Sequence, residues 1–316
     1  MNVRRLERPD LDDYRRASQV GAPYWAYLEA LNTDLRFRTF LDLGVELVVA
    51  EENDEYRAAC FVLPDLLDHG GRPEKIVWLF QLAATRDARN AGALLLLAMR
   101  EWYPTMMSVG VTDEAARVYR AMGWKSNEDV WRCVRPIDIG AVRNEEGRRL
   151  GRWARRGLGV GGVVYTIGTR LAESSVGFGA TRVAPSQPET KTTLPVGTHD
   201  RVRSVAHYLP VHSIQQGHDL LQAVDVGGIA RIVSDNTTGI GRHRAHARLW
   251  KSLRGQGVRL IEQVALSPAA CRTSLFSGYF PIRMPVYVWS RTGDPSPIFQ
   301  DFARSGFGFA DCDKIL

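Results

Sequence analysis

Lysine is scarce in this chain of 316 residues, although the formal net charge is +6. It occurs only at Lys75, Lys125, Lys191, Lys251 and Lys314, so arginine carries nearly all of the positive charge. The planar guanidinium of arginine binds carboxylates and phosphates through paired hydrogen bonds. This composition leaves two interpretations open, a site for a polyanion and an arginine-rich surface without a specific partner.

Cysteine pairs and long apolar runs are also missing. Cys60, Cys133, Cys271 and Cys312 are scattered without C-x-x-C spacing, which argues against a zinc ribbon and a disulfide framework. No apolar run reaches the roughly 18 residues of a membrane-spanning helix, and the charged N-terminus lacks the apolar core of a signal peptide. The sequence therefore predicts a cytoplasmic protein, and its length allows two domains.

The stretch from Ile76 to Trp124 has the clearest start and stop signals in the chain. It predicts a strand, a short loop, a helix, a second strand and a second helix, at Ile76–Ala84, Thr85–Ala91, Gly92–Trp102, Thr105–Val111 and Thr112–Gly123. A helix that links two neighbouring strands predicts that they run parallel. Upstream, the strand-like runs Val45–Ala50 and Tyr56–Leu63 predict an antiparallel hairpin. Downstream, Val130–Val134 is expected to be the last strand of the first half of the chain.

The second half of the chain repeats this element order. A hairpin, a loop, a helix, a strand, a short helix and a final strand at Pro285–Ser290 match residues 56–135 in outline. The sequence thus predicts an α/β (α+β) protein of two modules, each a mixed, mostly antiparallel sheet flanked by helices. The expected boundaries are 1–137 for the first domain, 138–200 for a connecting segment and 201–316 for the second domain.

The connecting segment is basic and then apolar. Arginines surround Trp153 between Arg148 and Arg156, and the uncharged run Gly157–Thr169 follows. Such a pattern is typical of a peripheral contact with an anionic membrane, here through residues 148–169. A connector docked between the two domains is the alternative.

The loop Thr85–Ala91 lies between a predicted strand and a helix N-terminus, where backbone N–H groups and the helix dipole favour an anion. Small residues there let a phosphate approach the backbone, and Arg86 and Arg89 add positive charge. The alternative interpretation is an ordinary turn capped by Asn90.

The segment AARVYRAMGW, Ala115–Trp124, resembles the A-x-x-L-Y-x-x-x-G-F segment of the GNAT superfamily of acyl-CoA-dependent N-acyltransferases. Tyr119 stands four residues before Gly123, as the family's tyrosine does. The resemblance implies that Tyr119 protonates the departing thiolate. A phenol suits this role because its pKa of about 10 keeps it protonated at neutral pH. A buried aromatic with a structural role alone is the alternative.

The same resemblance implies further site residues. Leu82, Ala83 and Ala84 match the splayed strand that pairs with pantetheine, and Gln81 is a candidate for orienting the acceptor amine or a water. The family's pyrophosphate loop, Q/R-x-x-G-x-G/A, corresponds to a run whose expected cofactor-binding residues are Arg86, Arg89, Asn90, Ala91, Gly92 and Ala93. Leu94 departs from the pattern, and a leucine there would obstruct a pyrophosphate or shift the loop.

The second module lacks the matching tyrosine, because Ser274 stands four residues before Gly278. It is expected to be a degenerate copy with a structural or substrate-binding role. The C-terminal SGFGFADCDKIL, with Asp311 and Asp313, resembles the tail of a bacterial tandem group associated with cell-surface polysaccharide genes. No metal site is expected, and His243 and His246 are predicted to face solvent.

These features predict an N-acyltransferase that uses acetyl-CoA or another acyl-pantetheine as co-substrate, without a metal. The acceptor would be a small-molecule amine, such as a sugar or amino compound of cell-surface glycan synthesis. One alternative is a Fem-like transferase that uses aminoacyl-tRNA, with Arg148–Arg156 on the RNA. The other is a GNAT-like binding or scaffold protein without catalytic activity.

Overall fold

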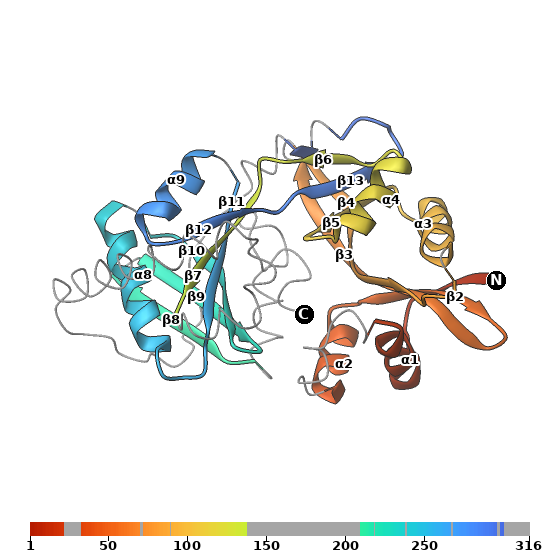
Figure 1. Ribbon diagram of the computed structural model, residues 1–316, viewed down its shortest axis with the longest axis horizontal. Coiled ribbons are helices and arrows are strands. Elements are labelled where there is room, and N and C mark those ends of the chain that lie inside the picture. Colours follow the sequence, from red (N-terminus) through yellow and green to blue (C-terminus); the bar gives the residue numbers. More distant parts are fainter. Residues whose placement is uncertain are drawn as a thin grey trace. The chain divides into compact units, whose positions relative to one another are not determined.

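The computed structural model describes residues 1–21, 33–69, 72–88, 90–137, 209–217, 219–237, 239–266, 268–295 and 298–299. Their contacts divide the chain into two compact units (Figure 1). The first unit contains Met1–Glu128 and the described residues from Met284 onward. The second contains the described residues between Asp129 and Arg283.

The first unit is built on a seven-stranded mixed sheet. In spatial order its strands are β1 (Asn2–Leu6), β2 (Glu46–Glu52), β3 (Glu55–His69), β4 (Arg72–Ala84), β5 (Thr105–Val109), β13 (Val286–Ser290) and β6 (Lys125–Asn127). All neighbours are antiparallel except β4 and β5. Helix α3 (Ala91–Trp102) connects these two strands, so the predicted parallel crossover is confirmed.

Helices cover both faces of this sheet. On one face, α1 (Leu11–Gly21) and α2 (Thr33–Asp42) pack through edge-to-face and tilted aromatic pairs whose rings belong to Tyr14, Phe37, Phe40 and Phe61. On the other face, α3 and α4 (Asp113–Ala121) share a core with the alternate residues of β3, such as Cys60 and Val62. Strand residues point alternately to the two faces, which explains how β3 serves both layers.

The second unit repeats this architecture on six strands. In spatial order they are β12 (Phe280–Arg283), β7 (Trp131–Pro136), β11 (Leu260–Ala265), β10 (Ile229–Asp235), β9 (Asp219–Val226) and β8 (Val211–Gln216). Strands β10 and β11 are parallel and are joined by α8 (Gly239–Leu253), as β4 and β5 are joined by α3. Helix α9 (Pro268–Phe276) follows β11. The protein is therefore α+β with two mixed sheets, which confirms the predicted fold class.

The two sheets exchange their late strands, which differs from the sequence prediction. The strand predicted at Val130–Val134 is β7, and it pairs with β11 and β12 in the second sheet. The strand predicted at Pro285–Ser290 is β13, and it inserts between β5 and β6 of the first sheet. Apolar alternation identifies a strand and its buried face but leaves its partner open, so the sequence placed each strand with its neighbours in the chain. The consecutive domain boundaries remain a prediction. Strands β7 and β13 each pair with a sheet on the other side of those boundaries.

Several predicted features fall outside the described residues. These are the whole connecting segment, 138–200, which includes residues 148–169, and the tail that holds Asp311 and Asp313. Within the part of the chain that the structure describes, no helix is both long and apolar enough to cross a bilayer.

Candidate active site

The candidate site begins where β4 and β5 separate. Their ladder consists, among the described residues, of Val77 with Met106 and Trp78 with Met107. Just beyond it, the hydroxyl of Ser108 donates to the carbonyl of Leu79, 3.3 Å away. The two strands diverge from there, which opens a gap at the C-terminal end of β4.

A β-bulge in β4 lies at the same place. Phe61 pairs with Phe80 and Ala59 with Ala83, so Gln81 and Leu82 together lie opposite a single residue of β3. Gln81 has a positive φ of 51°, which costs a residue other than glycine about 1–2 kcal/mol. Its side-chain Oε1 is buried and has no hydrogen-bond partner among the described residues. Strain and an unsatisfied acceptor at one residue are typical of functional positions.

The loop after β4 leads into α3 without a side-chain cap. Asn90 is the N-cap residue, but its side chain makes no capping hydrogen bond, so the capped-turn alternative is not formed. By contrast, the hydroxyl of Thr112 caps α4 by accepting from the N–H of Ala115 at 3.2 Å. First-turn N–H groups of a helix have no acceptor within the helix, and together with its dipole they favour an anion.

The loop itself is held to β3. The N–H of Thr85 donates to the carbonyl of Arg57 at 2.8 Å, and the guanidinium of Arg57 lies 3.2 Å from the carboxylate of Asp87. The ion pair is exposed and worth little by itself, but the two contacts fix the start of the loop. Sequence reasoning missed Arg57, because β3 supplies it from far upstream in the chain.

A cavity of about 410 Å³ brings most of the predicted site residues together. Among the candidates, it is lined by Leu82, Ala83, Ala84, Arg86, Gly92, Ala93 and Tyr119. Ala91 is buried in the core, and Asn90 is exposed outside the lining. Gln81 precedes the lining segment of β4, and Arg89 lies outside the described residues.

Leu94 does not line this cavity, and 43% of its surface is exposed. The residues of α3 that pack inward are Ala91, Leu95, Leu96 and Met99. Leu94 therefore lies on the outer side of the helix. The expected obstruction by its side chain does not arise at the cavity wall.

Tyr119 is held in a layered aromatic cluster. Its ring stacks on Trp124 with centroids 4.4 Å apart and planes within 11°. The ring of Tyr287 from β13 lies 5.6 Å away at a tilt of 58°. Only 1% of Tyr119 is exposed to solvent, although it belongs to the cavity wall. Tyr119 thus contacts aromatic rings from two other parts of the chain.

The end of α4 has an exact counterpart in geometry at the end of α9. The N–H of Trp124 donates to the carbonyl of Tyr119 at 3.0 Å, and the N–H of Tyr279 donates to the carbonyl of Ser274 at 3.0 Å. Gly123 and Gly278 both have a φ near 80°, which favours glycine. Ser274 thus occupies the position of Tyr119. It is 2% exposed and accepts a hydrogen bond from Gln263 at 2.8 Å.

The loop before α8 holds carboxylates where a phosphate would have to lie. Asp235 accepts hydrogen bonds from the N–H of Thr237 at 3.1 Å and from its hydroxyl at 2.5 Å, and it pairs with Arg242 at 3.0 Å. A Cβ at Gly241 would lie 2.9 Å from a carboxylate oxygen of Asp219. Two aspartates therefore surround the first turn of α8. An anion at this helix start would lie near two carboxylates, of which Asp235 is paired with Arg242.

His246 is fully buried, which corrects its predicted exposure; His243 is exposed as expected. The Nε2 of His246 lies 2.9 Å from the carboxylate of Asp235, and the Nδ1 of His246 lies 2.8 Å from the hydroxyl of Tyr279. Burial lowers the pKa of His246 below its ordinary value, so the ring is neutral and donates from Nε2. Burial alone would raise the pKa of Asp235, but His246 and Arg242 bring it below its usual range. The carboxylate partner lies on strand β10, outside the helix that holds His246, so helix spacing gave no signal of it.

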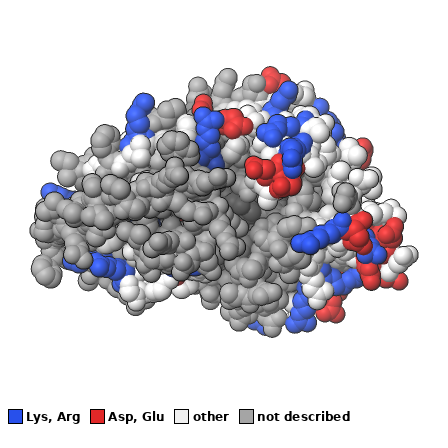
Figure 2. Space-filling view, viewed as in Figure 1, with Lys and Arg blue, Asp and Glu red and all other residues white. Residues whose placement is uncertain are grey.

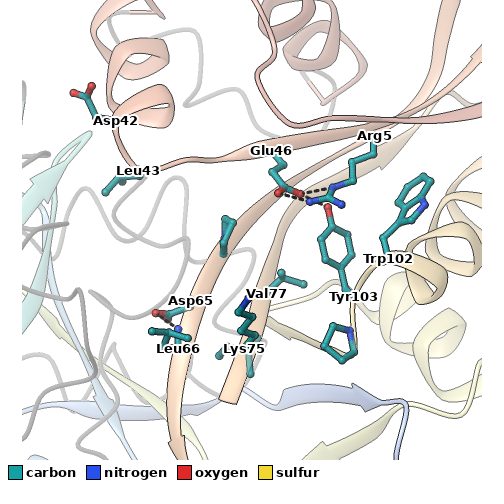
Figure 3. Close-up of a pocket in the computed structure, with 13 residues that line it drawn as sticks. Arg5, Asp42, Leu43, Glu46, Asp65, Leu66, Lys75, Val77, Trp102 and Tyr103 are labelled. Carbon is teal, nitrogen blue, oxygen red and sulfur yellow. Dashed lines mark hydrogen bonds and ion pairs between the residues drawn. The ribbon is translucent and has the colours of Figure 1, made fainter. Parts of the chain in front are cut away.

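A second cavity, of about 670 Å³, lies in the first unit at the other end of β4 (Figure 3). On one wall, Glu46 accepts two hydrogen bonds from Arg5, at 2.8 and 2.9 Å, and a third from the hydroxyl of Tyr103. Burial and this hydrogen bond raise the pKa of Tyr103 well above its ordinary value. The three side chains satisfy one another and join β1, β2 and the end of α3. Nothing in the sequence indicated this cluster.

Many described arginines are paired with carboxylates. Figure 2 shows blue Lys and Arg groups beside red Asp and Glu groups on the visible face. Arg4 and Arg16 share Glu51 at 2.7 and 3.3 Å, and Arg132 and Arg231 share the buried Glu262 at 3.3 Å each. These four arginines therefore form ion pairs within the protein. No group of three potential metal ligands was found in the described part of the chain.

The fold of this chain is similar to that of known protein structures. No protein-family model and no curated protein sequence matches this chain. A tandem GNAT protein from the clavulanic acid biosynthesis pathway matches with a TM-score of 0.54 and 12% identity, over 93% of this chain and 100% of that one. A putative acetyltransferase from Pyrococcus horikoshii matches with a TM-score of 0.53 and 8% identity, over 92% of this chain and 89% of that one. At these identities the likeness concerns the fold.

Proposed function

We propose that this chain, whose two sheets have the tandem GNAT fold, is an N-acyltransferase that moves an acyl group from an acyl-CoA thioester to a small amine. One observation supports this above all. The splayed end of β4, the uncapped start of α3 and Tyr119 all line a single cavity. These parts offer a binding edge for an extended chain, an anion site and a proton donor side by side.

The lining fits acyl-CoA in its chemistry. The backbone of Leu82–Ala84 would pair with the amides of pantetheine, and the N–H groups of Gly92 and Ala93 would face the pyrophosphate, with Arg86 adding charge. When bound, the thioester supplies the activated acyl group. A Cβ on Gly92 would meet only the Cβ of Ala84, at 3.8 Å, so the first turn of α3 is not sterically crowded.

The chain's own groups would then handle charge and protons. A backbone N–H of β4 near the bulge would donate to the carbonyl oxygen as negative charge develops there. The amine nitrogen bonds to the carbonyl carbon, the carbon–sulfur bond breaks, and Tyr119 gives its proton to the leaving thiolate. The proton that the amine loses passes to solvent, from which Tyr119 is restored. Gln81, whose Oε1 accepts no hydrogen bond from any described residue, would orient the amine or a water.

Acetyl-CoA and Tyr119→Phe test this function directly. Calorimetry with the wild type should show acetyl-CoA or a longer acyl-CoA binding below millimolar concentration. Tyr119→Phe should leave the Kd within about twofold and lower kcat by about 100-fold, because only the proton donor is lost. Tyr14→Phe is the matched control, since Tyr14 is equally buried in the same unit but packs on the opposite face.

Two outcomes would contradict the proposal. Absence of thioester binding at millimolar concentration would remove the acyl-CoA reading and favour a binding or scaffold role. Normal turnover by Tyr119→Phe would remove the acid role of Tyr119. The aminoacyl-tRNA alternative depends on Arg148–Arg156, which lie outside the described residues, and tRNA binding in the same titration would support it. The glycan acceptor remains part of the proposal, and a panel of amino sugars and other amines tests it.

A further inference from the structure

Strand β13 follows all strands of the second sheet in the chain, but it belongs to the first sheet. It pairs with β5 from Val286 to Ser290 and with β6 from Val286 to Val288. Tyr287 is at the centre of this arrangement, opposite Ser108 on one side and Ser126 on the other. Pairing on both sides fixes the backbone of Tyr287 more firmly than a strand at a sheet edge would be fixed.

The side chain of Tyr287 contacts α4 in two ways. Its ring lies against that of Tyr119, with centroids 5.6 Å apart. Its hydroxyl accepts a hydrogen bond from Nη1 of Arg120, 3.4 Å away, and Arg120 is the neighbour of Tyr119 in the helix. Tyr287 is 2% exposed, and burial raises its pKa above the ordinary value, so it stays neutral at working pH.

We propose that Tyr287 is a positioning residue that acts through Tyr119 and holds the phenol in the direction its reaction needs. This inference rests on the proposed function. Trp124 stacks on the ring of Tyr119, and Tyr287 approaches the same ring at a tilt of 58°, so Tyr287 opposes sliding of that ring in the plane of the stack. Displacement of a reacting group by about 1 Å can cost 100-fold in rate. The C-terminal part of the chain thus contributes to the active site of the first module.

The test compares Tyr287→Leu and Tyr287→Phe with Val288→Ala. Val288 is the next residue of β13, is buried and points to the opposite face of the sheet, so its truncation controls for loss of stability. Tyr287→Leu should lower kcat about tenfold or more with the KM for acetyl-CoA within about twofold. Tyr287→Phe keeps the ring and should stay within about threefold of the wild type, because the lost hydrogen bond is long.

A double variant decides whether the effect passes through Tyr119. In a Tyr119→Phe background, Tyr287→Leu should cause little further loss of kcat, because the proton donor that it positions is already gone. Equal losses in both backgrounds, or an equal loss in Val288→Ala at matched Tm, would overturn the inference while leaving the role of Tyr119 intact. If Tyr119→Phe alone turns over normally, the proposed acid role fails and the inference fails with it.

A measurement without substrate completes the test. The stacked pair of Tyr119 and Trp124 should give a near-ultraviolet circular dichroism band, which Trp124→Phe identifies. Tyr287→Leu should change that band, and Val288→Ala should leave it unchanged. An unchanged band in Tyr287→Leu would show that Tyr287 does not position the ring.

Discussion

Gln81 is held in a left-handed conformation inside β4, with its amide oxygen buried and unpaired among the described residues. Both features cost stability, so Gln81→Gly should raise the free energy of unfolding by about 1 kcal/mol. Urea unfolding measures this change. If Gln81 orients the acceptor, the same variant should lose activity despite its gain in stability.

Ala83→Gly is the matched control for Gln81. Ala83 is two residues away in the same strand and is not among the described residues with positive φ, so glycine there should lower stability by about 0.5–1 kcal/mol. Loss of stability in Gln81→Gly as well would show that the strand does not store strain at this residue.

At the scale of single residues, the sequence was informative where chemistry and spacing coincide. Tyr119, placed by its distance from Gly123, lines the cavity with Gly92 and Arg86. Gln81 was noticeable as one polar residue in an apolar strand, but its bulge depends on how β3 pairs with β4, which no local pattern encodes. His246 was misplaced for a similar reason, since Asp235 and Tyr279 come from other elements.

At the scale of elements, most helices and strands were predictable to within a few residues. The strands that the sequence missed are β6, β8 and β12. Lys-Ser-Asn in β6 is wholly polar and β12 contains Pro281, so neither shows the alternation by which strands are recognised. Which strands pair with one another was less predictable than which segments form strands, as the exchange of β7 and β13 between the sheets shows.

The exchange of strands predicts how fragments behave. A fragment of residues 1–128 lacks β13, so it leaves β5 and β6 without the strand between them and should aggregate. Fusing residues 284–295 to its end through a Gly/Ser linker should restore a soluble species that unfolds cooperatively. Size-exclusion chromatography and thermal circular dichroism measure both properties, and a scrambled 284–295 sequence is the control. A fragment 1–128 that is soluble and cooperative by itself would contradict this expectation.

At the scale of the whole molecule, two similar modules differ in what their phosphate-loop positions offer. The first has an uncapped helix start beside Arg86, whereas the second has Asp219 and Asp235 around the start of α8. Calorimetry should therefore give one acetyl-CoA per chain. Arg86→Glu should weaken this single site about tenfold or more, because the new charge repels phosphate.

Arg244→Glu is the matched control for the single site. Arg244 is exposed on α8, so the variant makes the same change in net charge within the second module. It should leave the Kd for acetyl-CoA nearly unchanged. Two equivalents of bound acetyl-CoA, or an equal effect of both variants, would show that the second module also takes part.

The position of β13 in the chain also delays completion of the first sheet during biosynthesis. On a ribosome that adds 5–20 residues per second, the segment that separates β6 from β13 takes on the order of ten seconds to synthesise. Throughout that interval the nascent first sheet exposes two strand edges that only a later part of the same polypeptide can cover. Codon usage or chaperone capture along this segment would therefore affect the yield of folded protein without altering any residue of the chain.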